Sequence, residues 1–400
     1  MCIRDRYNTS AESFSSILCL MDYNGKEMLV GTDNGIYLFD RERKTFRRGD
    51  SPFGLWALSD PTVHAMMRDN EGTLWVMTNS GGINYMSKQS KRFSTYSLSL
   101  TGMEKADKEI GPFCEDREKN VWVGTRNGLW FFNSQTHSFY EYSLKKSNIR
   151  YDVRSLLLEG DNLWVGTYAE GLHVLNLKTG NIKSYTYSRD IPNTLCSNDV
   201  LSLFKDRKGE IFVGTSWGLC RYNPQSDNFI TVINVGAMAS VTDIYEDMYN
   251  NLWIATSNRG VFCYNTIGEE WKHFEHIRED LTTITSNSVI TLFEDRKGTM
   301  WFGTNGGGLC SFSKETETFV DFDPENVWLP DKVIYSIEQD LAGNFWISCN
   351  SGLYQFNPTD KNKNRLFTIN DGLQGNQFTA QSSLASSTGK LYFGGVNGFN

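Results

Sequence analysis

The sequence predicts an all-β fold, and composition and repetition are the two observations that predict it. Glycine and tryptophan are both frequent, with 35 Gly and 11 Trp in 400 residues. Without a collagen period, this mixture is typical of a chain that alternates strands with tight turns. A motif centred on Gly-Thr also recurs nine times, at spacings of 41 to 48 residues. The central pair of the nine copies stands at residues 31–32, 77–78, 124–125, 166–167, 214–215, 255–256, 303–304, 348–349 and 394–395.

One copy, residues 289–322, shows how each repeat is expected to fold. The turn sequences D-R-K-G, N-G-G-G and K-E-T-E separate four segments rich in β-branched and aromatic residues. The expected strands are 289–295, 299–304, 308–312 and 318–322. Four short antiparallel strands in roughly 45 residues make one blade of a β-propeller, so we predict a β-propeller with four-stranded antiparallel blades.

A tryptophan occupies one equivalent position in the second strand of six repeats. These residues are Trp75, Trp122, Trp164, Trp253, Trp301 and Trp346. A small residue follows two positions later in eight of the nine copies, Met77 being the exception. Positions two apart share one face of a strand, and a large ring beside a small residue suits packing against the adjacent blade. We therefore expect the six tryptophans to lie in the core.

Polar residues in the turns have structural explanations that compete with ligand or metal binding. An aspartate at the start of a turn bonds to its own backbone, so the D-x-x-G turns need no calcium ion. These aspartates are Asp69, Asp206, Asp295 and Asp340. Asn34, Asn127 and Asn397 end another kind of turn, where we expect them to adopt the left-handed conformation.

Charge and cysteine usage exclude several classes of function. The net charge is −8 and no basic patch stands out, so nucleic acid is not an expected partner. The eight cysteines contain no C-x-x-C pair and the five histidines have no metal-binding spacing, so we expect no metal and no cofactor. No stretch approaches the length of about 18 apolar residues that would span a membrane. Whether any cysteines pair is left open.

The repeat D-x-x-G-x-hydrophobic-W-hydrophobic-G-T-x-x-G-hydrophobic resembles the two-component regulator propeller repeat. In that family the repeats form the periplasmic sensor of bacterial hybrid two-component systems, which respond to glycans. Two seven-bladed propellers there precede a β-sandwich, one membrane span, a histidine kinase, a receiver and a DNA-binding domain. The resemblance implies a periplasmic segment that signals as a homodimer. It also implies a tether to the inner membrane through a C-terminal region, containing the kinase, that lies outside this chain.

The resemblance also implies a domain organisation. Nine repeats are too many for one ring of about four to eight blades. Residues 78–96 are similar to the last blade of the family's first propeller, 110–125 to the opening blade of the second, and 370–400 to its closing blade. We therefore expect residues 1–105 to be the last two blades of a truncated N-terminal propeller. Residues 106–400 would be a seven-bladed propeller whose last blade is truncated.

A candidate ligand site follows from the order of the strands. The turn after Gly-Thr and the connection between blades lie at the same end of each blade, so both sets of loops gather on one face of the ring. Their aromatic, amide and charged side chains suit an oligosaccharide, and an arginine would pair with a uronate or sulfate. Trp217 stands out because it lies beside a glycine, away from the motif tryptophan position. The candidate residues are Arg126, Tyr168, Glu170, Asn198, Trp217, Arg259, Asn287 and Trp328.

The sequence leaves two alternatives to a non-catalytic sensor. Propellers also form glycosidases and lyases, and glycoside hydrolysis needs two carboxyl groups flanking the scissile bond. Glu170 is the acid that the short turns supply, while Asp199 and Asp331 lie in inter-blade loops and no pair singles itself out. We therefore assign no catalytic residues. A scaffold that binds only other proteins is the second alternative.

Overall fold

Almost all regular structure in this protein is antiparallel β-strand. The computed structural model describes residues 15–48, 58, 60–70, 72–86, 93–96, 109–142, 152–233, 239–323, 329–357 and 363–400. The chain divides into two compact units, which we describe separately. The first contains Met1–Met103 with Asn370–Leu373, and the second contains Glu104–Ile369 with Gln374–Asn400.

The first unit contains two described sheets, in which the strands follow one another in chain order. The first sheet consists of β1 (Ile17–Asp22), β2 (Glu27–Thr32), β3 (Gly35–Asp40) and β4 (Thr45–Arg48). The second consists of β5 (Val63–Arg68), β6 (Leu74–Thr78) and β7 (Ile83–Met86). Leu29 and Ile36 of the first sheet pack against Val63 and Val76 of the second, and these side chains form the core of the unit.

Trp75, on the other face of the second sheet, contradicts one expectation. Trp75 on β6 is 36% exposed, although the motif tryptophans were expected in the core. In the second unit the equivalent Trp253 is 1% exposed because Phe302 and Phe319 of the following sheet cover it. Among the described residues of the first unit, no sheet covers Trp75 from that side. The prediction for Trp75 is therefore wrong for this structure.

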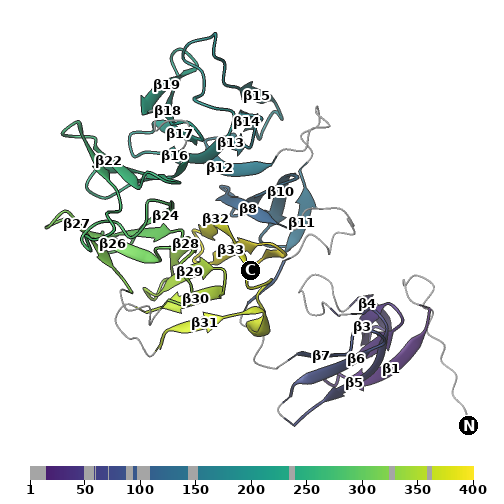
Figure 1. Ribbon diagram of the computed structural model, residues 1–400. Helices are drawn as coiled ribbons and strands as arrows, with labels where there is room; N and C mark the ends of the chain where they lie inside the picture. The colour runs from purple at the N-terminus through teal and green to yellow at the C-terminus, as the bar shows by residue number, and fades with distance from the viewer. Residues whose placement is uncertain are drawn as a thin grey trace, which may run out of the picture. The chain divides into compact units, whose positions relative to one another are not determined.

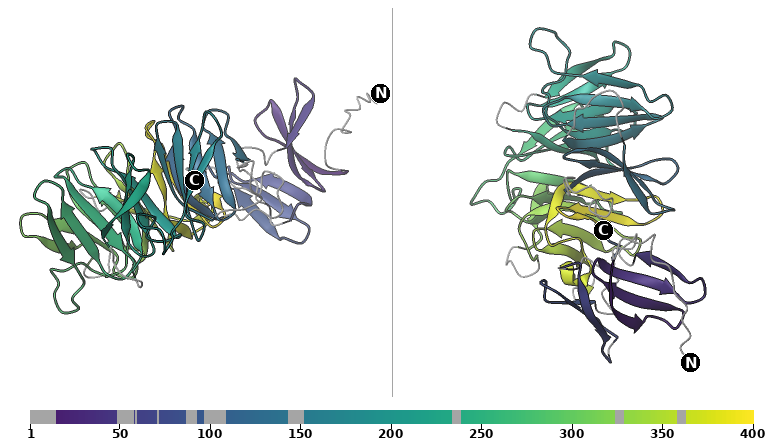
Figure 2. Two further views of the ribbon diagram at one scale, coloured as in Figure 1. Left: turned by 90° about the horizontal axis from the view of Figure 1, so that it is seen from above. Right: turned by 90° about the vertical axis from the view of Figure 1, so that its right-hand side faces the viewer.

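The described residues of the second unit form seven sheets, which follow one another around a common centre (Figure 1). The first of these sheets consists of β8 (Ile110–Glu115), β9 (Val121–Thr125), β10 (Gly128–Asn133) and β11 (Ser138–Glu141), and the second of β12 (Val153–Glu159), β13 (Asn162–Thr167), β14 (Leu172–Asn176) and β15 (Ile182–Tyr185). The third consists of β16 (Val200–Lys205), β17 (Ile211–Thr215), β18 (Leu219–Asn223) and β19 (Asn228–Ile233). The fourth consists of β20 (Val241–Glu246), β21 (Asn251–Thr256), β22 (Val261–Asn265) and β23 (Glu270–Phe274). The fifth consists of β24 (Val289–Glu294), β25 (Met300–Thr304), β26 (Leu309–Ser313) and β27 (Thr318–Asp321). The sixth consists of β28 (Ile334–Gln339), β29 (Phe345–Cys349), β30 (Gly352–Phe356) and β31 (Arg365–Phe367). The seventh consists of β32 (Phe378–Ala385), β33 (Leu391–Gly395) and β34 (Gly398–Phe399). The turned views of Figure 2 show these sheets as separate, twisted blades.

The first strand of each sheet lies on the inside of the ring. Each inner strand contacts the inner strand of the next sheet, and β32 contacts β8, so the ring is closed. At the closure, the hydroxyl of Ser382 donates a hydrogen bond of 3.1 Å to the carbonyl oxygen of Ile110. The ring of Phe399 lies 5.6 Å from that of Phe113 and 5.3 Å from that of Phe132. The predicted all-β propeller fold is confirmed.

The glycine of the Gly-Thr pair lets consecutive sheets approach closely. A Cβ atom on Gly166 would lie 2.6 Å from Cγ1 of Val200, at the start of the next inner strand. A Cβ atom on Gly394 would lie 2.7 Å from Cγ2 of Ile110, so the last and first sheets of the ring also approach closely at a glycine. This explains why a small residue stands two positions after the tryptophan. Any larger side chain would push the two sheets apart.

The aspartate that opens the turn between the first two strands of a sheet binds the motif tryptophan, a role that the sequence did not predict. Oδ2 of Asp247 accepts a hydrogen bond of 2.9 Å from the indole N–H of Trp253, six residues further on. The same bond joins Asp69 to Trp75, Asp295 to Trp301 and Asp340 to Trp346. Where Phe212 replaces the tryptophan, the carboxylate of Asp206 accepts a hydrogen bond from the backbone N–H of Glu210 instead. The turn and the second strand are therefore fastened together in four repeats.

The expectation for the turn asparagines is wrong. Asn34, Asn127 and Asn397 do not have a positive φ. The glycines that follow them adopt the left-handed side of the map instead, and these are Gly35, Gly128 and Gly398, with φ of 102°, 130° and 125°. Glycine adopts this conformation without the steric cost that a Cβ atom adds, so the asparagines need not adopt it.

Candidate functional site

The turns that carry the candidate residues are held by the threonine of the Gly-Thr pair. The hydroxyl of Thr215 donates a hydrogen bond of 2.9 Å to the carbonyl oxygen of Gly218. The hydroxyl oxygen of Thr215 in turn accepts bonds of 3.2 Å from the backbone N–H groups of Trp217 and Gly218. Thr256 holds the turn of Arg259 in the same way, with bonds to Gly260 and Arg259. These side chains are therefore presented from a fixed backbone.

Trp217 lies on such a turn, between β17 and β18, and remains 49% exposed. Its ring centroid is 6.3 Å from that of Tyr187, at an interplanar angle of 49°. Tyr187 belongs to the connection that precedes β16 and is itself 39% exposed. Its contribution was not predicted, because nothing in the sequence indicates how that connection returns over the turn. The two rings together form an aromatic surface that stays open to solvent.

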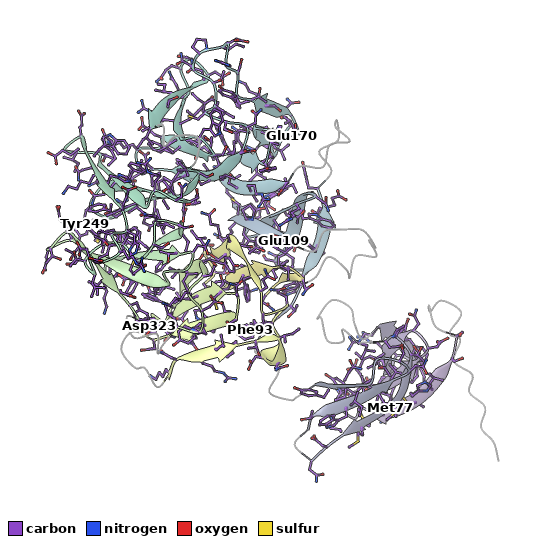
Figure 3. All side chains as sticks on the ribbon, viewed as in Figure 1. Met77, Phe93, Glu109, Glu170, Tyr249 and Asp323 are labelled. Atoms are coloured by element: carbon purple, nitrogen blue, oxygen red, sulfur yellow. A yellow bond between two sulfur atoms is a disulfide. The ribbon has the colours of Figure 1, made fainter. Side chains whose placement is uncertain are left out.

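Tyr168 and Glu170 lie on the neighbouring turn, between β13 and β14, and both are exposed. Figure 3 labels Glu170. Oδ1 of Asp199 accepts a bond of 2.9 Å from the backbone N–H of Ala169, while its Oδ2 accepts one of 3.1 Å from the hydroxyl of Ser216. Asp199 therefore joins the turn of Tyr168 to the turn of Trp217. Because both of its oxygens hold the loops, Asp199 is engaged in structure and makes a poor partner for Glu170 in hydrolysis.

Asn198 and Asn287 occupy equivalent positions and hold the inter-blade connections. Oδ1 of Asn198 accepts a hydrogen bond of 2.7 Å from the backbone N–H of Tyr187, and its carbonyl oxygen accepts one of 2.9 Å from Gly171. Asn287 accepts the corresponding bonds from His276, at 2.6 Å, and from Gly260, at 2.8 Å. Their placement on the predicted face thus has a structural cause. Ligand contacts by either residue remain a prediction.

Arg126 and Arg259 are exposed, and each has an acidic neighbour. Nε of Arg126 lies 2.6 Å from Oε2 of Glu109, and its second nitrogen donates a bond of 3.1 Å to Oε1 (Figure 3 labels Glu109). Nε of Arg259 lies 3.2 Å from Oε1 of Glu275. A uronate or sulfate would have to displace these carboxylates, so the structure gives less support to an acidic sugar than the sequence did. Trp328 lies outside the described residues.

A disulfide bond joins Cys196 to Cys220, a pairing that the sequence left open. It fastens the connection that contains Tyr187 and Asn198 to β18, the strand that follows Trp217. The two cysteines are 24 residues apart and lie in different elements, so no local spacing signals the pair. Disulfides persist in oxidising compartments and are rare in the cytosol. Because it links this connection to β18, the disulfide restrains the loops of the candidate site.

The structure therefore brings together one half of the predicted set. Tyr168, Glu170, Asn198 and Trp217 lie on two turns and a connection that Asp199 and the disulfide link. Arg259 and Asn287 form a corresponding arrangement on the sheet β20–β23 and its following connection, and Arg126 lies on the sheet β8–β11. A cavity of about 770 Å³ lies elsewhere, between the sheets β12–β15 and β16–β19, and none of the eight predicted residues lines it.

Two further observations concern metals and membranes. In the described part of the chain, no group of three or more His, Cys, Asp or Glu side chains is placed to hold a metal ion. No helix among those residues is long and apolar enough to cross a bilayer.

Comparison with known proteins identifies the repeat. The model of the family described as two component regulator propeller matches residues 57–80, 237–258 and 283–306. These segments contain the Gly-Thr motif of three repeats, so the resemblance predicted from the sequence is confirmed.

Similar proteins cover much of this chain, but the chain spans only part of them. Histidine kinase P4 of Formosa agariphila is 23% identical over 329 residues, which are 80% of this chain and 24% of that protein. The extracellular domain of a protein from B. thetaiotaomicron assigned as a hybrid two component system has a TM-score of 0.74 at 23% identity, over 98% of this chain and 52% of that chain. Virginiamycin B lyase from Staphylococcus aureus has a TM-score of 0.54 at 13% identity, over 74% and 94%. The two structural likenesses show the fold alone.

Proposed function

We propose, from the two-component regulator propeller repeats of which this chain is built, that it is a ligand-sensing segment of a hybrid two-component histidine kinase. The chain spans about a quarter of the length of histidine kinase P4. In this proposal the kinase activity lies in a region outside the chain. The similarity to an extracellular domain of such a system supports the same role. In this proposal the segment itself performs no catalysis.

The proposed ligand is an oligosaccharide that binds the turns of the ring. The half-exposed Trp217, held by Thr215 and set beside Tyr187, is the observation that carries this proposal. Sugar rings present apolar C–H faces that stack on aromatic rings, with hydroxyl groups around them that need polar partners. Glu170 and Tyr168 on the neighbouring turn supply such partners. The disulfide and Asp199 limit the entropy that the loops would lose on binding.

The proposed location is the periplasm, with a tether to the inner membrane through a C-terminal region. The disulfide between Cys196 and Cys220 supports an oxidising compartment. Signalling would proceed through a homodimer with two arrangements. A ligand shifts such an equilibrium only as far as it binds one arrangement better than the other. Equal affinity for an isolated monomer and for the dimer would therefore contradict this part of the proposal.

Calorimetric titration with a panel of neutral and acidic oligosaccharides tests the ligand class. We expect saturable binding by one sugar class, and binding at least tenfold weaker in Trp217→Ala. Trp271→Ala is the matched control, because Trp271 is 42% exposed on the outer strand β23 and should leave the affinity unchanged. Reducing-sugar release is measured in the same samples. Cleavage of a sugar would show that the protein is a glycosidase or lyase and not a sensor. If no sugar in the panel binds, a protein-binding scaffold would be favoured.

A further inference from the structure

The cavity of about 770 Å³ lies at the end of the ring opposite to the turns that carry Trp217. It separates the sheets β12–β15 and β16–β19, and residues near the first-to-second and third-to-fourth strand turns line it. Trp164, Tyr185 and Tyr222 form an aromatic wall, in which the ring of Trp164 lies 5.0 Å from that of Tyr222. Asn162 and Asn181 add amide groups. We call this cavity the β13–β18 groove.

A short turn opens this groove. Only Gly160 and Asp161 connect β12 to β13, whereas Asp247–Asn250 connect β20 to β21. In that second case Tyr249 of the longer turn lies in the equivalent groove (Figure 3), with Nζ of Lys314 at 3.2 Å from its ring centroid. The equivalent groove has a volume of only about 200 Å³. The β13–β18 groove is therefore wide because its turn lacks the residues that fill the equivalent space.

A buried donor without a hydrogen-bond partner also lies beside the groove. Asp247 accepts the indole N–H of Trp253, but the sequence Glu159-Gly160-Asp161 brings no carboxylate to Trp164. Trp164 lines the groove and is 5% exposed, and its Nε1 has no hydrogen-bond partner among the described residues. A buried N–H group without a partner costs roughly 1–3 kcal/mol. An acceptor oxygen brought in by a ligand would recover that cost.

Apart from Lys208, the charged side chains that line the groove are paired with described residues. Arg221 lies 2.6 Å from Glu210 across the wall. Lys183 pairs with Asp227, which also accepts hydrogen bonds of 2.6 Å from the hydroxyl of Tyr185 and of 2.9 Å from that of Tyr222. The ammonium group of Lys183, followed by the two hydroxyls, lowers the pKa of Asp227 to about 2. The groove therefore offers aromatic faces and amides but little uncompensated charge.

We propose that the β13–β18 groove is a second ligand site, which takes an uncharged, polyhydroxylated molecule of the size of a short oligosaccharide. The aromatic wall would face the apolar side of a sugar ring, while the amides and the indole N–H of Trp164 would bind its hydroxyl oxygens. The volume falls within the range of about 300–1,000 Å³ that ligand pockets have. The site is separate from the turns around Trp217. This proposal rests on the proposed function in one respect, namely that the ligand is a sugar.

Two variants and one matched control test the site. Asn181 is an exposed groove residue on the turn between β14 and β15, so Asn181→Trp should block the groove without disturbing the core. Glu270 has the same place in the equivalent groove, because it pairs with Asn265 as Asn181 pairs with Asn176, and Glu270→Trp is the control. Trp164→Phe keeps an aromatic ring but removes the N–H donor. The probes are neutral gluco-, xylo-, manno- and galacto-trisaccharides, titrated by calorimetry.

We expect one of these trisaccharides to bind the wild type, with affinity at least tenfold lower in Asn181→Trp and about fivefold lower in Trp164→Phe. Glu270→Trp and Trp217→Ala should retain that binding event. No binding of any neutral trisaccharide would overturn the groove site, and so would binding that both groove variants leave unchanged. The function proposed above would survive either result if Trp217→Ala still weakened the binding of a sugar from the larger panel.

Discussion

Asp247 opens the turn between β20 and β21 and shows how one side chain contributes to the stability of a repeat. Asp247 is 2% exposed. Its Oδ1 accepts bonds of 2.9 Å from the backbone N–H groups of Tyr249 and Asn251, and its Oδ2 accepts the side-chain amide of Asn251 at 2.8 Å and the indole of Trp253 at 2.9 Å. One carboxylate therefore accepts hydrogen bonds from four donors, one of which is the buried indole N–H of Trp253.

The first prediction follows from that network. Asp247→Ala should lower the free energy of unfolding by roughly 2–4 kcal/mol, because the buried indole N–H of Trp253 and three part-buried donors lose their acceptor at once. Asp206→Ala is the control, because Phe212 offers no indole N–H and the carboxylate bonds to the backbone of Glu210 instead. We expect it to cost roughly 1 kcal/mol. Urea unfolding measures both, and equal losses would show that the bond to the indole contributes nothing.

Among the structural elements, the connection before β16 gains its order from the disulfide. It contains Tyr187 and Asn198, whose hydrogen bond of 2.7 Å shapes the aromatic surface beside Trp217. Cys196 lies within the same connection and bonds to Cys220 on β18. The position of Tyr187 thus depends on a covalent link as well as on local hydrogen bonds.

The second prediction concerns that link. Cys196→Ser should destabilise the protein by roughly 3 kcal/mol, because a loop closed across 24 residues loses its constraint on the unfolded chain. Thermal unfolding with and without a reductant measures the effect. The reductant should lower the melting temperature of the wild type and leave that of the variant unchanged. A wild type that does not respond to reductant would show that the bond contributes no stability.

The sequence predicted the strands and turns of the repeats but not the contacts between distant elements. Turn residues and alternating hydrophobic residues are local signals, so they appear in any one repeat, such as residues 289–322. The bond from Asp247 to Trp253 repeats at a constant spacing of six residues, and that regularity was available in the sequence. The groove was not predictable, because it arises from residues that the turn at Gly160 lacks. Tyr187 was missed because a connection between blades has no period to reveal its path.

At the scale of the whole ring, the inner strands enclose a central cavity of about 410 Å³ that contains two acids. Asp243 on β20 accepts hydrogen bonds of 2.8 Å from the backbone N–H groups of Ile244 and Leu292, and Glu338 on β28 accepts one of 2.8 Å from the hydroxyl of Ser383. Burial raises the pKa of both carboxyl groups to about 7. Closing the ring thus makes the stability of the whole unit sensitive to pH.

The third prediction is the direction of that sensitivity. The pKa of Glu338 is about 7 in the folded protein and about 4.3 in the unfolded chain, so the folded state binds more protons between these values. Stability should therefore fall as the pH rises from about 4 to above 7. Glu338→Gln removes the carboxylate and should be more stable than the wild type by roughly 1–3 kcal/mol at pH 8, with the difference shrinking toward pH 5. Glu315→Gln, at an exposed position, should show no such dependence. Denaturant unfolding at several pH values measures it, and a Glu338→Gln advantage that grows on acidification would refute the burial of this charge as its cause.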